Sequence, residues 1–216
     1  MDGMAISAMS AGRQLQGGAR MQAERGPAAI FYAELRNFTG LSEVLDPERV
    51  LQLASTFFSL AGAAVKAQDG EVLSLQNDAL VGAFRNGRPA QSAMRAILAA
   101  QALLRDFGPV GERWQSDYGL PATISAGVHL GDTIFGMAGP QGGEQYVAFG
   151  DTVSIAERLV HRARAGEIVL SSAVAAAIGA ATTASLEAKP LPPLDLGRRP
   201  AMSIYGILLE TRLDFT

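Results

Sequence analysis

Apolar and polar positions alternate along the chain with two different periods. Residues 28–35 form an apolar run that ends at a polar boundary, which predicts a buried strand. From residue 46 to residue 70, apolar side chains recur every three or four positions, which predicts a helix. Asp46 can cap the start of this helix, Pro47 suits its first turn, and Gly70 ends it.

The rest of the chain repeats this exchange between strand-like and helix-like segments. Residues 71–76 and 79–84 predict two short strands, and the Asn77-Asp78 pair between them predicts a hairpin turn. The remaining predicted elements are strands at 122–139, 144–149, 167–171 and 202–209, and helices at 89–108, 151–165 and 172–178. Gly108 is the expected end of the second long helix, and residues 186–200 are expected to be a proline-rich connection.

This order of elements predicts an α+β fold in which helices cover one face of a mixed sheet. The length of 216 residues fits one domain with extensions better than two domains. We assign residues 28–210 to that domain and residues 211–216 to a C-terminal tail. Residues 1–27 are rich in Gly, Ala, Met and Gln, so we expect a flexible or weakly helical N-terminal linker there.

Composition excludes several classes of function. Hydrophobic residues make up 48% of the chain, enough for a core, and the net charge of −3 does not favour binding to nucleic acid or to an anionic membrane. The chain has no cysteine, which excludes disulfides, zinc–thiolate sites and thiol catalysis. We find no apolar run of about 18 residues and no secretory signal, so we expect no membrane span and a cytoplasmic protein.

Four segments, in order, resemble the motifs of the class III nucleotidyl cyclases, which make cyclic AMP or cyclic GMP. The segment FYAELRNFTGLSE resembles F-x-D-I-x-G-F-T, and GEVLSLQNDALVGAF resembles K-x-x-G-D-A-x-x-x-x-F. Further on, ISAGVHLGDTIFGMAG resembles G-I-H-x-G-x-x-x-G-x-x-G, and YVAFGDTVSIAERL resembles G-D-x-V-N-x-A-x-R-L. The resemblance covers roughly residues 28–210. It implies a ferredoxin-like α+β domain that pairs head to tail, with active sites at the dimer interface.

The resemblance implies a site for two divalent ions, Mg²⁺ or Mn²⁺. Cyclisation needs the ribose 3′-oxygen to attack the α-phosphate, and two ions can activate that oxygen and neutralise the phosphates. Such ions prefer carboxylate oxygens. The family's two metal-binding acids correspond to Glu34 and Asp78 in this sequence.

The resemblance also implies how a nucleoside triphosphate would be held. Backbone amides near Asn37, Phe38 and Thr39 would bind the triphosphate. The family's transition-state Asn and Arg correspond to Ser154 and Arg158, which are four residues apart on a predicted helix and therefore share a face. Their role would be to stabilise charge on the pentavalent phosphorus.

Several positions depart from the family pattern. Glu34 replaces an Asp and is one methylene longer, and Ser154 replaces an Asn, a kind of loss that costs about 10²–10³ in rate in known enzymes. Ser74 and Val147 stand where the family places the Lys and the Asp or Thr that read the base, and a valine cannot hydrogen-bond a purine. Arg198 aligns loosely with a triphosphate-binding cation.

Each of these residues also has an ordinary structural explanation. Asp78 suits a turn, Glu34 could be an acid at the end of a strand, and Arg158 could be a surface charge. We expect His129 to be a structural strand residue and His161 to be a solvated helix residue.

The resemblance leaves two functions open. In the first, which we favour because of the departures, the chain is a degenerate cyclase domain that binds a nucleotide or a partner and serves as a regulatory or dimerisation module. In the second, it is a working lyase that converts a nucleoside triphosphate into a 3′,5′-cyclic nucleotide and pyrophosphate, with altered base choice. The expected assembly is a homodimer, and the alternative is a heterodimer with another cyclase-like chain.

Overall fold

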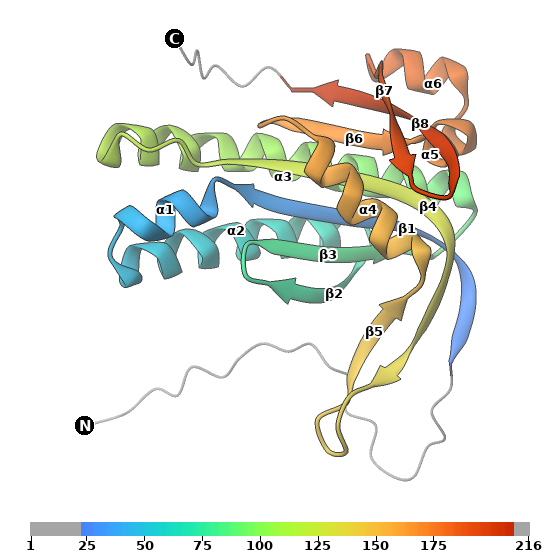
Figure 1. The fold of residues 1–216 in the computed structure, drawn as a ribbon, viewed down its shortest axis with the longest axis horizontal. Coiled ribbons are helices and arrows are strands. Elements are labelled where there is room, and N and C mark those ends of the chain that lie inside the picture. The colour runs from blue at the N-terminus through green and yellow to red at the C-terminus, as the bar shows by residue number, and fades with distance from the viewer. Residues whose placement is uncertain (1–22, 210–216) are drawn as a thin grey trace.

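The computed structural model describes residues 23–209 as an eight-stranded mixed sheet with helices on both faces (Figure 1). The strands are β1 Glu24–Arg36, β2 Glu71–Gln76, β3 Ala79–Phe84, β4 Thr123–Ala138, β5 Gln145–Phe149, β6 Glu167–Ser171, β7 Lys189–Leu196 and β8 Arg199–Leu208. The helices are α1 Phe38–Val44, α2 Pro47–Ala67, α3 Pro89–Tyr118, α4 Asp151–Arg162, α5 Ser172–Ile178 and α6 Ala180–Ser185. The predicted tail at 211–216 and the first 22 residues of the predicted linker lie outside the described residues, and β1 begins within the last part of that linker.

The first part of the domain has the ferredoxin-like arrangement. The chain runs β1, α2, β2, β3, α3, β4, and the sheet order is β2-β3-β1-β4, with every neighbouring pair antiparallel. The sheet continues through β6, β8 and β7, where β6 is parallel to β4, while β5 pairs with β4 off this path. The predicted α+β class with a mixed sheet is therefore confirmed.

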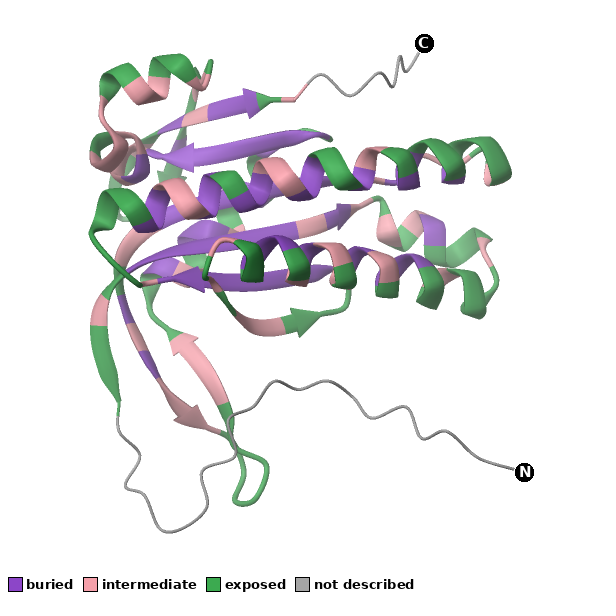
Figure 2. Ribbon diagram, turned by 180° about the vertical axis from the view of Figure 1, so that it is seen from behind, coloured by how far each residue is buried: buried purple, intermediate pink, exposed green. Residues whose placement is uncertain are grey.

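Helices cover both faces of the sheet, so the prediction of a single covered face is wrong. Helices α2 and α3 pack on one face, and α4 crosses the other (Figure 1). The reason lies in β1, where Ala29, Phe31 and Ala33 point to the α2/α3 side and Ile30 and Tyr32 point to the α4 side, all of them buried. A strand that is apolar on both sides needs cover on both faces. Figure 2 shows this burial concentrated in the central strands and on the sides of α2 and α3 that face them.

Helix α2 is long and apolar enough, by length and composition, to cross a membrane. This is weak evidence for a membrane span, because a helix that packs on a protein core passes the same test. Its buried residues, among them Leu53, Phe57, Ala61 and Val65, form one stripe that belongs to the core between the sheet and α3. Asp46 caps this helix as predicted, since its side chain accepts a hydrogen bond from the Arg49 backbone amide.

Helix α3 does not end at Gly108 as predicted. It continues to Tyr118 and ends at Gly119, which has the left-handed φ of 66°. The proline after Gly108 removes a backbone donor and disfavours helix. The buried stripe nevertheless continues through Val110 and Trp114, and burying these side chains offsets that cost.

The predicted proline-rich connection contains a strand, β7, at the edge of the sheet. Pro190, Pro192 and Pro193 lie within it, and within residues 23–209 its only sheet partner is β8. An edge strand tolerates proline because half of its backbone groups face away from the ladder. The two short helices α1 and α6 were also not predicted.

His129 is buried in β4 and joins that strand to the start of α5. Its Nδ1 and the Oγ of Ser171 share a hydrogen bond of 2.8 Å, and Ser171 also caps α5 through the Val174 amide. Burial lowers the pKa of His129 to about 4, so the ring is neutral at neutral pH. This position matches the expected structural role.

We predict that Gly111→Ala destabilises the domain and that Gly62→Ala does not. A Cβ on Gly111 would lie 2.3 Å from the carbonyl oxygen of Ala122, whereas a Cβ on Gly62 in α2 would meet nothing within 4 Å. The first change should cost about 1–3 kcal/mol of unfolding free energy through overpacking. The second should add roughly 0.5–1 kcal/mol through helix propensity. Urea unfolding of the three proteins measures both effects, and equal shifts would contradict the close contact between α3 and the start of β4.

We predict that the stability of the domain depends on pH through His129. The pKa of this imidazole is lowered in the folded state, so the unfolded chain binds its proton first and stability is lost as the pH falls from about 6.5 towards 4. The loss should reach about 2–3 kcal/mol at pH 4.5 and should be absent from His129→Asn. Unfolding free energies at pH 7.5 and 4.5 test this, and parallel profiles for the two proteins would refute it.

Candidate active site between strand β1 and helix α4

The two predicted metal acids lie on neighbouring segments of the sheet. Glu34 is near the end of β1 and pairs with Ala79 at the start of β3, and Asp78 directly precedes that strand in the hairpin turn. The Leu35 amide donates a hydrogen bond of 2.7 Å to the Asp78 carbonyl, which fixes the turn against β1. The hairpin turn at Asn77-Asp78 is as predicted, and Asn77 has a positive φ within it.

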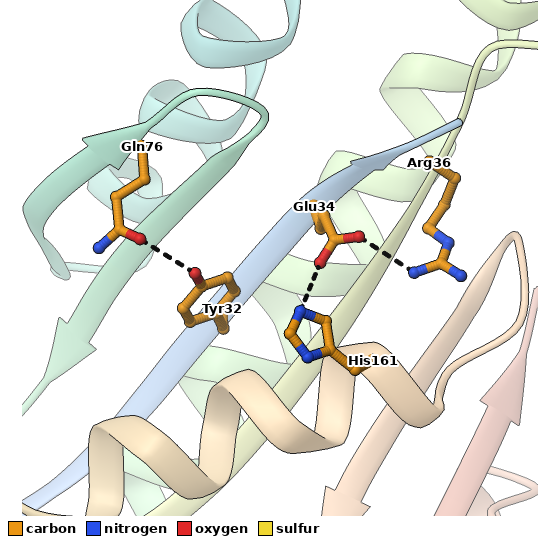
Figure 3. A network of polar contacts seen from close by, with 5 residues as sticks. All are labelled: Tyr32, Glu34, Arg36, Gln76 and His161. Carbon is orange, nitrogen blue, oxygen red and sulfur yellow. Dashed lines mark hydrogen bonds and ion pairs between the residues drawn. The ribbon is translucent and has the colours of Figure 1, made fainter. Parts of the chain in front are cut away.

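Both carboxylate oxygens of Glu34 are engaged by basic side chains of the same chain (Figure 3). Oε1 lies 3.1 Å from Nη1 of Arg36, and Oε2 lies 3.2 Å from Nε2 of His161. The Glu34 side chain is only 15% exposed. His161, expected to be solvated, is half exposed but reaches from α4 to this carboxylate.

A buried tyrosine adjoins the acids. The Tyr32 hydroxyl donates a hydrogen bond of 3.2 Å to Oε1 of Gln76 on β2 (Figure 3). Burial, together with the nearby negative charges of Glu157, Glu34 and Asp78, raises the pKa of Tyr32 to about 12. The phenol is therefore a permanent hydrogen-bond donor in this region.

Helix α4 carries the two predicted catalytic residues on its outer face. Its inner face, including Ala156, packs so closely on β4 that a Cβ at Gly127 would lie 2.4 Å from the Ala156 carbonyl oxygen. Ser154 and Arg158 are both exposed, in agreement with their predicted shared face. The Arg158 guanidinium donates a hydrogen bond to the backbone carbonyl of Asp195 in β7, beside a shallow surface depression.

The β7–β8 hairpin is tied to the start of α4 by an ion pair. Both terminal nitrogens of Arg199 contact the Asp151 carboxylate, with Nη2 2.9 Å from Oδ1. Hydrogen bonding from Arg199 lowers the pKa of Asp151. Arg198, the predicted triphosphate-binding cation, lies exposed in the turn of this hairpin, next to the residue that makes the ion pair.

The two base-reading positions lie on strands that contact each other. Ser74 is half-buried on β2, and its Oγ accepts a hydrogen bond of 3.4 Å from Nε2 of Gln76. Val147 is half-buried on β5, where it pairs with Gly136, and β5 lies against β2. Neither position carries the Lys, Asp or Thr side chain that the family pattern has there.

The predicted triphosphate-binding turn has a specific backbone shape. Asn37 adopts the left-handed conformation, with φ of 59°, and precedes the first turn of α1, which starts at Phe38 and Thr39. The family pattern has glycine at this position, and asparagine is among the few other residues that tolerate it. The turn is therefore kept although its glycine is lost.

Within residues 23–209 no cluster of three or more His, Asp or Glu side chains is arranged to hold a metal ion. Mg²⁺ is commonly bound through one or two carboxylates together with substrate phosphates. Asp78 is available for that role. Glu34 fits it poorly, because Arg36 and His161 already occupy its carboxylate.

Sequence reasoning missed Tyr32, Arg36 and His161 as members of this site. The spacing of Arg36 and His161 from predicted site residues could have identified both of them. Arg36 follows Glu34 by two positions in a strand, so the side chains share a face. His161 follows Arg158 by three positions in a helix, so it lies on the same side as the predicted catalytic residues.

Known proteins similar to this chain are cyclases. The family model "Adenylate and Guanylate cyclase catalytic domain" matches residues 21–205. Adenylate cyclase 1 of Rhizobium meliloti is 30% identical over 191 residues, which cover 85% of this chain and 28% of that protein. Retinal guanylyl cyclase 2 of Bos taurus is 28% identical over 134 residues, which cover 60% of this chain and 12% of that protein. The chain thus spans less than a third of the length of these relatives.

Solved structures show the same fold at low sequence identity. The adenylyl cyclase CyaB from P. aeruginosa superposes with a TM-score of 0.79 at 20% identity, covering 88% of this chain and 98% of that one. The guanylyl cyclase Cya2 superposes with a TM-score of 0.73 at 21% identity, covering 86% and 93%.

Proposed function

The chain belongs to the family of adenylate and guanylate cyclase catalytic domains, and we propose that it is a degenerate member. In this proposal it binds a nucleoside triphosphate with Mg²⁺ or Mn²⁺, turns it over slowly or not at all, and acts as a dimeric regulatory module.

The observation that carries this proposal is that both carboxylate oxygens of Glu34 already contact basic side chains. An active family member needs this acid to hold a divalent ion, whereas here its two oxygens contact Arg36 and His161. A divalent ion at Glu34 would face the positive charge of Arg36 at short range, and a guanidinium cannot lose its proton. The first metal position is therefore disfavoured by the chain itself.

Three further positions support reduced turnover. Ser154 presents a shorter donor than asparagine towards the phosphorus, and losing one such donor costs about 10²–10³ in rate. Ser74 and Val147 leave the base without its usual hydrogen bonds. A base that is not fixed leaves the 3′-oxygen poorly aligned, and alignment contributes roughly 7–11 kcal/mol in favourable cases. These losses act on one site and are not additive.

The residues that match the family pattern support nucleotide binding. Asp78 supplies a carboxylate for a phosphate-bound ion, and Arg158 and Arg198 supply exposed guanidinium groups for phosphate oxygens. The amides of the turn at residues 37–39 supply further donors. Arg158 and Arg198 would contact phosphate oxygens and not the nucleobase, so we expect weak selectivity among nucleotides.

Dimerisation is part of the proposal. One similar structure is described as a non-canonical dimeric guanylyl cyclase domain from Blastocladiella emersonii, with a TM-score of 0.65. In an isologous pair the same two surfaces meet twice, which makes two equivalent clefts. A heterodimer with a chain that supplies the base-reading residues is the alternative.

The experiment that tests the proposal is calorimetric titration of ATP, GTP, CTP and UTP with Mg²⁺ or Mn²⁺, followed by an assay for cyclic product. We expect binding without appreciable product. Asp78 and Arg158 are also what a working lyase would keep, so rapid formation of a cyclic nucleotide by this chain would replace the proposal with that function. Absence of both binding and product would leave only a scaffold.

We predict that Asp78→Asn weakens binding of a nucleotide–Mn²⁺ complex by at least about tenfold, because it removes the carboxylate available to the ion. The matched control is Asp117→Asn, an exposed acid near the end of α3, which should leave the affinity unchanged. Equal affinities for the parent and Asp78→Asn would show that the ion is held elsewhere.

We also predict a dimer in solution at tens of micromolar. Light scattering with a concentration series measures the mass directly. A monomer mass throughout the series, in the presence of nucleotide and Mn²⁺ as well as in their absence, would count against the assembly on which two complete clefts depend.

A further inference from the structure

The two contacts of Glu34 connect separate elements of the fold. The carboxylate lies between a strand and a helix that are far apart in the sequence, and each of its oxygens has a different partner. Arg36 comes from β1 itself and His161 comes from the outer face of α4 (Figure 3). The Glu34 carboxylate thus links the end of β1 to the last turn of α4.

Three acidic side chains lie near Tyr32 on one side of this link. Glu157 on α4, Asp78 in the hairpin turn and Glu34 each raise the pKa of the Tyr32 phenol. Such a group of acids needs compensating positive charge in a half-buried region. Arg36 provides that charge next to Glu34, and the His161 ring contacts its second oxygen, whereas Asp78 has no ion pair among the described residues.

We propose that Glu34 is a structural counter-ion that joins β1 to α4, and that Arg36 and His161 take the place of one of the family's two divalent ions. This inference rests on the proposed function: the domain then binds a nucleoside triphosphate with a single ion, held by Asp78 and the phosphates. The two acids, equivalent in the family pattern, have separate roles in this chain.

The metal stoichiometry tests this directly. Electron paramagnetic resonance counts the Mn²⁺ bound per molecule of an ATP analogue with a methylene group between the α- and β-phosphorus atoms. We expect one ion in the parent, and a second ion in the double variant Arg36→Gln/His161→Gln. Glu34→Gln should change Mn²⁺ affinity by less than about twofold, whereas Asp78→Asn should change it by at least about tenfold. Two ions in the parent, or equal losses in the two acid variants, would overturn the proposal.

A second measurement does not depend on nucleotide. Thermal unfolding of Glu34→Gln, His161→Gln and their combination forms a double-mutant cycle, with Glu157→Gln as the control for removing a nearby acid. We expect the combined variant to lose little more stability than either single variant, because both remove the same link. If the domain binds no nucleotide, the proposed function fails while this cycle still decides the role of Glu34. Additive losses would overturn that role.

Discussion

The fold depends on the burial of β1 on both of its faces. Its apolar run needs α2 and α3 on one side and α4 on the other, and the ladder pairs it with β3 and β4. This burial brings the end of β1, where Glu34 stands, directly under the helix that carries Ser154 and Arg158. The candidate site is thus a product of the same packing that holds the sheet together.

One face of helix α4 packs on the sheet, and the opposite face carries the candidate functional residues. Its inner positions are small or aliphatic and allow close approach at Gly127, while its outer positions are Ser154, Arg158 and His161. A rotation of this helix would change both sets at once. The Arg199–Asp151 pair at its start and the Glu34–His161 contact at its end resist such a rotation.

The sequence predicted correctly those elements whose hydrophobic period and turn residues indicate the same structure. The strands at 71–76 and 79–84 and the turn between them were found because period and turn chemistry agree. The end of α3 and the strand β7 were missed, because packing at Trp114 and an edge position in the sheet outweighed glycine and proline. Glu34 and Asp78 could be located from motifs, but their different surroundings could not. Those surroundings depend on His161, which is 127 positions from Glu34 in the sequence and meets it only through the fold.

The prolines of β7 also limit how copies of the chain can associate. This strand closes one end of the sheet, and Pro190, Pro192 and Pro193 have no backbone N–H to offer. These positions cannot donate to a strand from a second molecule, so continuation of the hydrogen-bond ladder is disfavoured at this end of the sheet. Any contact that a second copy makes at β7 would therefore depend on side chains rather than on a continued backbone ladder.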